Sequence, residues 1–583
     1  MEKKNYIALT ALESHWAEPD NTLFLGEWCK LAHRKEVWSK YCSKTIAHNW
    51  NGDAKQVGEA VDYCDKIAKQ LIKSLNVLLE KHFSLNFPER FYEKLLAPWA
   101  FFFTATLYDR YLSIKQVNNS ERHIFLTLNT QTPLFPAHDF LCWAGRAATS
   151  DYYNLFLFSE IITLLKLPEE ERLCCNESIV DTPRILPKKT LKKRCLLAAA
   201  YFFNKVLGRP YYVVGGVTKN KFVNFFTSSF GSILQDNIWE HKHTPPPCID
   251  TTIRQTELKL KNEDEFSSLL AKLALRHLPW GFLEAMPSYV EQAKKHPASK
   301  ACCLVSSTGH WGSILWLYIV AVSGAPYGIV EHGGYKNTVE PSQTKSLEQF
   351  ISERYFDSGV GSHPLPNPEL YFENLTLSSD ASTVLFVSSF FQRYPAKGGY
   401  LRGADSAWMY YARQIDFFEQ VNPEFHLQYR PFLVNNGYED FEKIVNSHPN
   451  ITLQSTSMPY KDAVAAAKLI IFDNCWLSLA IIQVLTLRKP CILIYYADLC
   501  GVSKQMQRVM QCMADAKILY FNAKDAAEHL NSVYHDIDSW WQTEKVQKAL
   551  DLFINNFACS VDNWPAKWAQ SLKLFAKEFN KNK

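Results

Sequence analysis

The chain has 583 residues, of which 47% are hydrophobic, 21% charged and 14% aromatic. This much apolar surface excludes a disordered chain, because burying it compensates for the entropy lost on ordering. The formal net charge of +4 lacks the clustered basic excess typical of a nucleic-acid-binding protein. At about 150 residues per domain, the length predicts roughly two to four domains.

Cysteine usage indicates a reducing compartment. The 15 cysteines cannot all pair with one another, and none of them shows the two-residue spacing typical of zinc sites. We therefore interpret them as small buried side chains in the cytoplasm, and we predict no metal site. The first residues carry no secretory signal pattern. The most apolar stretch, 311–330, is interrupted by Gly324 to Pro326, so a buried helix at about 309–323 and a buried strand at about 326–331 fit better than a membrane span.

The first half of the chain is predicted to be rich in helices. Short strands are expected at 6–10 and 22–26. Helical periodicity follows at 54–83, after Pro88, at 151–165 and at 190–206. Pro98 should kink the helix after Pro88 or divide it in two. The polar stretches 176–190 and 241–262 are expected to be loops.

The second half shows a different pattern after the Ser-, Pro- and Asn-rich stretch 362–382, the best candidate for a domain boundary. Strands are predicted at 383–390, 425–430, 451–454, 468–473, 491–496 and 517–521. Helices are predicted between them at about 404–420, 438–446, 460–467 and 477–488, and after them at about 523–533. This alternation predicts a doubly wound parallel sheet. The tail 539–580 is expected to be helical and to pack back across the molecule.

Polar residues follow several of these strands, at the edge where an open parallel sheet binds its ligands. They are Ser388, Ser389 and Arg393, then Arg430, Ser455 and Thr456, Asp473 and Asn474, and Tyr495 and Tyr496. Arg430 could hold a phosphate bidentately or form a structural ion pair. Because no glycine-rich dinucleotide motif and no Walker loop occurs, a dinucleotide enzyme or a P-loop kinase is disfavoured.

The segment 473–490 combines a strand, a turn with Ser478, a helix with Gln483, and Pro490 at the next strand. Nucleotide-sugar transferases with two Rossmann domains carry a hydroxyl residue, an acid and a proline at this spacing. There the hydroxyl and the helix N-terminus meet the phosphate and the acid meets the ribose. Here an amide, Gln483, takes the place of the acid. The alternative is an ordinary buried helix–strand pair.

A second constellation, Glu331-His332-Gly333-Gly334, directly follows the apolar strand at 326–331. The two glycines allow positive φ angles or a close approach of the backbone, and the histidine offers a base at neutral pH. The acids Glu340, Glu348 and Glu353 come after it. This segment is either a plain turn or one wall of a cleft.

A series of short elements is spread over nearly the whole chain, namely Leu9–Glu13, Trp16, Phe24–Cys29, Arg90–Tyr92, Pro98–Trp99, Tyr108–Tyr111, Glu331–Tyr335, Glu340, Glu348, Glu353–Tyr355, Gly359, Asp473–Asn474, Pro490, Trp540–Trp541 and Phe557–Ala558. In this combination and order, the chain resembles bacterial surface-carbohydrate transferases encoded beside lipopolysaccharide and nonulosonic-acid genes. The sequence departs from the family pattern at Glu331, where glutamine is usual, at Glu353 and Asp357–Gly359, and at Leu479, Ala480 and Gln483.

The resemblance implies an α/β protein of the GT-B-like class, with two Rossmann-like domains facing each other across a cleft. Residues 1–375 would be the acceptor-side domain with helical insertions. Residues 376–535 would bind the nucleotide sugar, and residues 536–583 would pack back on the first domain. The implied activity is a metal-independent glycosyl transfer to a glycan or a lipid-linked saccharide. The implied donor is a CMP-linked acidic sugar such as a nonulosonic acid or Kdo, used as a substrate with no cofactor.

In this interpretation His332, Glu340 and Glu348 are the candidate bases for the acceptor hydroxyl. The candidate donor-binding residues are Gly333, Gly334, Ser389, Arg393, Arg430, Asp473, Asn474, Ser478 and Gln483. The basic run 188–194 is either a solvated face or a contact with the inner membrane. Two other functions stay open, a CDP-polyol phosphotransferase and a non-catalytic carbohydrate-binding or scaffold protein. The oligomeric state does not follow from the sequence.

Overall fold

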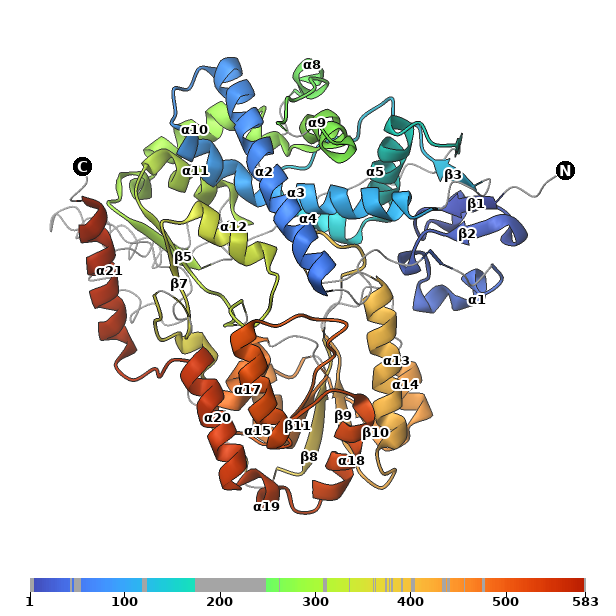
Figure 1. Cartoon of the computed structure of the whole chain (residues 1–583), viewed down its shortest axis with the longest axis vertical. Helices are drawn as coiled ribbons and strands as arrows, with labels where there is room; N and C mark the ends of the chain where they lie inside the picture. Colours follow the sequence, from blue (N-terminus) through green and yellow to red (C-terminus); the bar gives the residue numbers. More distant parts are fainter. Residues whose placement is uncertain are drawn as a thin grey trace.

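The structure is a computed structural model that describes residues 5–41, 45–46, 54–117, 123–172, 248–261, 263–307, 312–334, 336–359, 361, 363–372, 375–376, 378, 381–389, 392–399, 404–432, 437, 441–455, 457–473 and 478–580. Within these residues, helices surround three sheets whose strands all pair in parallel (Figure 1). This arrangement confirms the α/β class predicted from the sequence. The domain boundaries near 375 and 535 stay predictions. The helix predicted at 190–206 and the basic run 188–194 lie outside the described residues.

The first sheet has the order β2-β1-β3-β4, and it lies at the right of Figure 1. Its strands are β1 (Asn5–Ala8), β2 (Thr22–Phe24), β3 (His123–Thr127) and β4 (Glu169–Glu171). The sequence predicted the first two strands and missed the other two. β4 consists of three glutamates that are exposed or half-buried, so it has no apolar alternation by which a strand could be recognised.

Long helices connect this sheet to the rest of the protein. They are α2 (Ala54–Phe83) and α3 (Glu89–Lys115), which pack side by side. Pro98 lies inside α3 but does not divide it. Most of α3 is buried, including the aromatic run from Trp99 to Phe103, so packing on several sides compensates for the backbone hydrogen bond that proline cannot make. Shorter helices in this region are α1 (Lys35–Trp38), α5 (Asp151–Leu164), α8 (Thr251–Arg254), α9 (Glu265–His277) and α10 (Met286–Lys295).

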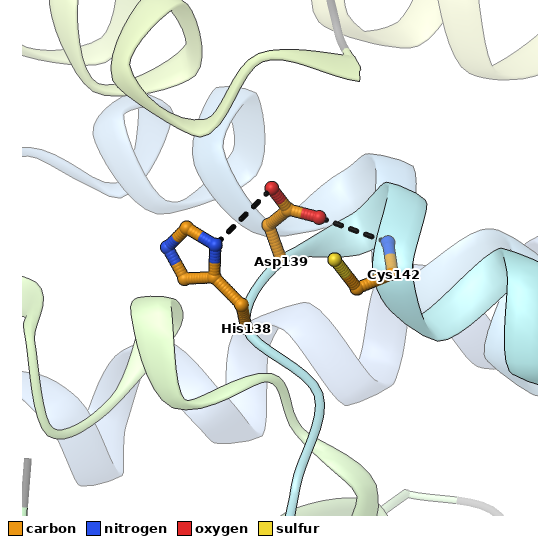
Figure 2. Close-up of side chains that lie close together, drawn as sticks. All are labelled: His138, Asp139 and Cys142. Carbon is orange, nitrogen blue, oxygen red and sulfur yellow. Dashed lines mark hydrogen bonds and ion pairs between the residues drawn. The ribbon is translucent and has the colours of Figure 1, made fainter. Parts of the chain in front are cut away.

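Helix α4 (Phe140–Thr149) packs against α3 and α5. The side chain of Asp139 caps its N-terminus by accepting a hydrogen bond from the backbone nitrogen of Cys142 at 2.9 Å (Figure 2). The capping residue satisfies a backbone donor that has no partner inside the helix, and this fixes the point where α4 begins.

The second sheet has the order β5-β6-β7 and consists of Leu304–Ser307, Tyr327–Val330 and Arg354–Phe356. Helix α11 (Ile314–Ser323) precedes β6 and ends at Gly324, whose φ of 61° is left-handed, and α12 (Gln343–Ile351) precedes β7. The predicted buried helix and strand at 309–331 are thus confirmed where the residues are described. Among those residues, no helix is both long and apolar enough to cross a membrane.

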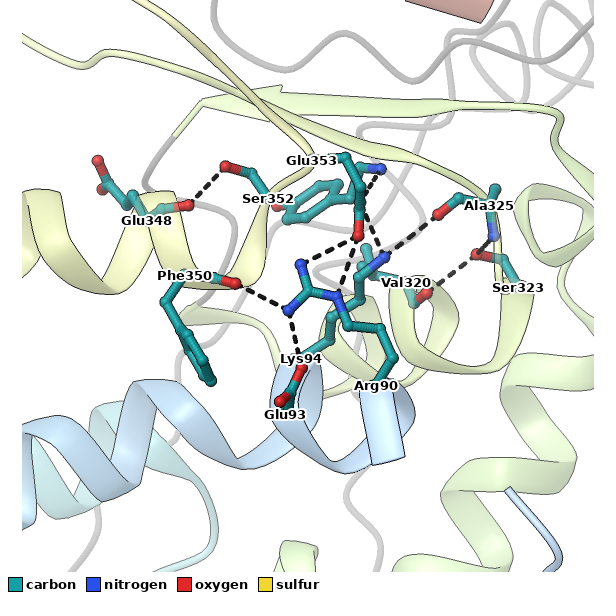
Figure 3. Close-up of polar contacts among 11 residues, drawn as sticks. Arg90, Glu93, Lys94, Val320, Ser323, Ala325, Glu348, Phe350, Ser352 and Glu353 are labelled. Atoms are coloured by element: carbon teal, nitrogen blue, oxygen red, sulfur yellow. Dashed lines mark hydrogen bonds and ion pairs between the residues drawn. The ribbon is translucent and has the colours of Figure 1, made fainter. Parts of the chain in front are cut away.

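An ion cluster fastens α3 to this sheet. The carboxylate of Glu353, next to β7, accepts hydrogen bonds from Arg90 at 3.0 Å and from Lys94 at 3.0 Å (Figure 3). It also accepts one from the backbone nitrogen of Tyr327 at 2.6 Å. Arg90 in addition contacts Glu93 at 2.9 Å. One carboxylate therefore joins a helix and two strands that are far apart in the sequence.

The third sheet has six strands in the order β10-β9-β8-β11-β12-β13, at the bottom of Figure 1. The strands are β8 (Thr383–Val387), β9 (Leu427–Arg430), β10 (Ile451–Leu453), β11 (Ala467–Phe472), β12 (Cys491–Ile494) and β13 (Leu519–Tyr520). The helices of this part are α13 (Ala404–Gln420), α14 (Phe441–Ser447), α15 (Tyr460–Ala466), α16 (Leu479–Thr486), α17 (Lys504–Asp515) and α18 (Ala523–Val533). Every predicted strand is confirmed, and α17 is a helix that the sequence analysis did not assign.

The C-terminal helices are α19 (Ile537–Trp541), α20 (Glu544–Phe557) and α21 (Trp564–Asn580). α20 packs against α16 and α17. The ring centroids of Trp568 and Phe575 on α21 lie 5.4 and 5.8 Å from that of Phe356 in β7. The tail thus returns to the second sheet, as predicted.

Candidate active site

The strand order of the six-stranded sheet locates a candidate site. Numbered along the chain, the strands lie in the order 3-2-1-4-5-6, which is that of the Rossmann fold. The order reverses between β8 and β11, and ligands of such sheets bind beyond the carboxyl ends of the strands at that point. Ser388 and Ser389 follow β8, and Asp473 follows β11. The sequence therefore placed three of its candidate residues at the switch point.

A buried polar network surrounds Asp473. Its carboxylate accepts a hydrogen bond from the Tyr410 hydroxyl and another from the Gln414 amide at 2.7 Å, both on α13. The Tyr410 hydroxyl accepts a hydrogen bond from the backbone nitrogen of Ser389 at 2.8 Å, and Gln414 also donates to the Ser388 hydroxyl at 3.2 Å. Burial raises the pKa of Asp473 to about 7. The network holds the segment after β8 in a fixed position beneath the edge.

Arg430 ends β9 on the same edge, and Ser388 donates its backbone N–H to the Arg430 carbonyl at 3.0 Å. The guanidinium donates to the Gln454 side chain at 2.7 Å and to the Met458 carbonyl at 2.9 Å. No carboxylate in the described part of the chain pairs with it. Partial burial lowers the pKa of the Arg430 guanidinium from its usual range, and the group keeps its charge because arginine is not deprotonated in proteins.

Tyr460 links Arg430 to the start of α16. The Arg430 guanidinium lies 5.9 Å from the centroid of the Tyr460 ring. The Tyr460 hydroxyl donates to the carbonyl of Ala480, in the first turn of α16, at 3.0 Å. Ser478 is the N-cap residue of α16, but its hydroxyl does not make the capping hydrogen bond. A guanidinium and a helix N-terminus thus adjoin the same tyrosine, an arrangement that attracts anions. Asn474 lies outside the described residues.

The loop after β6 also lies close to α16. Glu331 is buried, and its carboxylate accepts hydrogen bonds from the backbone nitrogens of Lys336 and Ser358, both at 3.0 Å. Gly333 and Gly334 have φ angles of 80° and 69°, which favour glycine. A Cβ on Gly334 would lie 2.9 Å from Ile482 on α16. The predicted loop is therefore in direct contact with the helix that carries Gln483.

His332 and Gln483 meet at a short 3₁₀ helix, Pro368–Leu370. The Nδ1 atom of His332 lies 3.5 Å from the carboxylate of Glu369, and the Gln483 amide donates to the Glu369 carbonyl at 2.8 Å. The His332 side chain is 53% exposed, so solvent and ligands can reach it. The structure thus brings these two candidates together around a residue that the sequence analysis did not single out.

The two acidic candidates differ in their surroundings. Glu340 is exposed, and its backbone nitrogen donates to the Gly501 carbonyl at 3.2 Å, so it lies where the loop after β6 meets the segment after β12. Glu348 is fully buried on α12 and pairs with Lys336 at 2.5 Å. In this position Glu348 orders the loop after β6 through Lys336, and its predicted role as a base stays a prediction.

Arg393 points away from the edge. Its guanidinium pairs with Asp151 at 2.5 Å and donates to the Trp28 carbonyl at 3.3 Å. The neighbouring Tyr394 hydroxyl donates to the same carboxylate at 2.5 Å. The segment after β8 is thus tied to the N-terminal sheet and α5. The geometry gives Arg393 a structural partner, and its predicted role in donor binding stays a prediction.

A family model described as a LIC12162 family transferase matches residues 5–572, nearly the whole chain. The chain belongs to this family of transferases. The prediction of an enzyme is therefore confirmed. None of the curated proteins matches the chain.

Several solved structures are similar to parts of this family member. The HepE protein of Anabaena, solved with UDP and glucose, is 14% identical, with a TM-score of 0.35 over 54% of this chain and 90% of that one. An O-GlcNAc transferase of Thermobaculum terrenum is 11% identical, with a TM-score of 0.32 over 91% and 100%. MurG of Acinetobacter baumannii is 13% identical, with a TM-score of 0.32 over 63% and 100%.

Sequence reasoning missed several residues of the candidate site, namely Tyr410, Gln414, Tyr460, Glu369 and Lys336. One signal was available. Tyr410 and Gln414 are four residues apart on α13, and both are buried, so they form a polar pair on the apolar face of an amphipathic helix. The contacts of Tyr460 and Glu369 depend on how distant segments pack, and no local pattern indicates them.

Proposed function

We propose that the protein transfers a sugar from a nucleotide-activated donor to an acceptor hydroxyl, and that it is a GT-B-like glycosyltransferase. The observation that carries the proposal is Arg430, a guanidinium without an acidic partner in the described chain. It ends β9, one strand from the Rossmann switch point, and lies 5.9 Å from the ring centroid of Tyr460, whose hydroxyl contacts the first turn of α16. The phosphate of a nucleoside monophosphate or diphosphate would supply the negative charge that pairs with Arg430. The transferase family and the earlier resemblance support the same reaction class.

In the proposed reaction the acceptor oxygen bonds to the anomeric carbon while the bond from that carbon to the donor phosphate breaks. Arg430 and the α16 N-terminus stabilise the negative charge that develops on the departing nucleotide. If the reaction inverts, a base takes the proton of the acceptor hydroxyl. His332 and Glu340 are exposed where the loop after β6 meets the six-stranded part, so they are the proposed bases. Glu348 positions that loop through Lys336.

For the donor we propose a CMP-linked acidic sugar such as a nonulosonic acid or Kdo, and for the acceptor a surface glycan or lipid-linked saccharide at the cytoplasmic face of the inner membrane. This finer proposal rests on the resemblance. The amide of Gln483 in place of a carboxylate is compatible with a changed donor contact. A CDP-polyol phosphotransferase would use the same phosphate contacts, so nucleotide preference and product analysis together separate the two.

The test is a thermal-shift measurement with CMP, CDP, UDP and GDP, followed by the variant Arg430→Ala. Native-state binding at a hundred times Kd stabilises by about 2.7 kcal/mol. A charge-assisted hydrogen bond contributes about 1.5–3 kcal/mol, so Arg430→Ala should raise the Kd of the preferred nucleotide by roughly 10- to 150-fold. Arg508→Ala, at an exposed position on α17, is the matched control and should leave the Kd of that nucleotide unchanged. Wild-type affinity in Arg430→Ala would disprove the assignment.

A further inference from the structure

Three side chains of different chemistry converge at the N-terminus of α4. They are His138, Asp139 and Cys142, which lie within five consecutive residues (Figure 2). One ring nitrogen, one carboxylate oxygen and one sulfur of this cluster all lie within 4.8 Å of one another. None of these residues belongs to the site described above. A set of nitrogen, oxygen and sulfur donors at such distances is a candidate for a shared metal ion.

The separation of His138 and Asp139 is that of an ion pair, and it also fits a shared metal ion. The Nδ1 atom of His138 lies 3.6 Å from Oδ2 of Asp139. This is too long for a hydrogen bond. Two ligands of one tetrahedral ion, each at about 2.0–2.2 Å from the metal, lie roughly 3.4 Å apart. The ion would therefore bind both atoms with only small movements of the side chains.

The surrounding contacts fix the orientation of these ligands. His138 Nε2 is 2.8 Å from the Tyr289 hydroxyl, and when Nε2–H donates to it, Nδ1 presents its lone pair to the carboxylate. The imidazole also stacks on Trp280, with ring centroids 4.3 Å apart. One oxygen of Asp139 accepts the capping hydrogen bond from Cys142, which directs the carboxylate plane. The first ligands are thus held by a supporting shell, as in known metal sites.

Access and ligand type indicate the class of metal. The side chains of His138 and Asp139 are 23% and 10% exposed, so water can complete the coordination. A thiolate and an imidazole favour zinc-like transition metals over magnesium or calcium, which prefer oxygen ligands. We propose that His138, Asp139 and Cys142 bind one zinc-like divalent ion, with water in the remaining position. The ion would fasten the loop before α4 to the first turn of that helix.

The sequence analysis predicted no metal site because it searched for paired cysteine and histidine spacings. The pattern His138-Asp139-x-x-Cys142 contains no such pair. Asp139 also has an ordinary explanation as a helix cap, which conceals its second role. Only the folded loop shows that the carboxylate, the imidazole and the sulfur lie close together (Figure 2).

The test is a titration of the full-length, metal-free protein with Co²⁺ and Zn²⁺. We expect one Co²⁺ per chain with thiolate-to-cobalt charge-transfer absorption, displaced by Zn²⁺, and a higher melting temperature with Zn²⁺. Asp139→Asn keeps a capping residue of equal quality but removes the charged ligand. Because even supporting residues of metal sites contribute about 10- to 100-fold, Asp139→Asn and Cys142→Ser should each weaken binding by about 100-fold or more.

The control is Cys512→Ser, which removes an exposed cysteine on α17. It should bind cobalt as the wild type does. Absence of stoichiometric binding in the wild type would overturn the proposal. Equal binding in the wild type and in both ligand variants would also overturn it, as would loss of the charge-transfer band in Cys512→Ser.

Discussion

Removing the charge of Glu353 is predicted to lower the free energy of unfolding more than removing most other single charges of this protein. Its carboxylate is the shared partner of Arg90 and Lys94, and the side chains of Glu353 and Lys94 are 21% and 5% exposed (Figure 3). Glu353→Gln keeps the size but leaves the Lys94 ammonium buried without its counter-charge. Breaking a buried pair from one side costs about 3–5 kcal/mol, and the partial exposure of Glu353 places the expected loss near the lower end, about 3 kcal/mol.

The assay is thermal unfolding of purified variants. For a cooperative unit of 150–250 residues, about 3 kcal/mol corresponds to a fall of roughly 6–12 °C in Tm. Lys94→Met in the Glu353→Gln background should recover part of that loss, because it removes the uncompensated ammonium. The matched control is Glu528→Gln, which breaks an exposed pair with Lys524 and should cost at most about 0.5 kcal/mol. If Glu353→Gln has the same Tm as Glu528→Gln, the reasoning is refuted.

Three further predictions concern the candidate site. Gly334→Ala should lower the free energy of unfolding by about 1–3 kcal/mol more than Gly324→Ala. Both glycines have left-handed φ angles, but only a Cβ on residue 334 would lie against α16. Equal losses of stability in denaturant unfolding of the two variants would contradict this prediction. As the pH rises from about 4 to about 7, the free energy of unfolding of the wild type should fall by up to about 4 kcal/mol relative to that of Asp473→Asn. The raised pKa of Asp473 means that the folded state holds a proton which the unfolded state has already lost, and this stabilisation disappears when the proton leaves. Parallel stability–pH curves of the two proteins would contradict this prediction. His332→Ala and Glu340→Gln should lower turnover by about a hundred- to ten-thousand-fold with little change in Tm or donor affinity, whereas normal turnover would exclude them as bases.

The six-stranded sheet was predictable because each of its buried strands is a short apolar run of the kind seen in Leu469–Phe472 and Cys491–Ile494. Parallel strands covered on both faces need such runs, so local sequence identifies them. The first sheet was harder. Its fourth strand, Glu169–Glu171, pairs through the backbone and has no apolar side chains, so no local pattern indicates it.

The candidate site was predictable to a similar degree. The rule that ligands bind at the carboxyl ends of parallel strands located Arg430 and Asp473 from their strands alone. The rule does not predict in which direction a side chain after a strand points. Arg393 follows β8, yet it pairs with Asp151, 242 residues earlier in the chain. A contact over that separation depends on the packing of the N-terminal sheet, which local sequence does not describe.

The contact between Arg393 and Asp151 also affects how the protein is made. At about 5–20 residues per second, the ribosome needs roughly 12–50 s to extend the chain from Asp151 to Arg393. For that time the surface around Asp151, which is largely covered in the finished protein, stays open to solvent and to other nascent chains. Released as a fragment, residues 1–375 would keep this surface exposed permanently. We expect the fragment to aggregate, and a soluble, monodisperse fragment would show that the two halves fold independently.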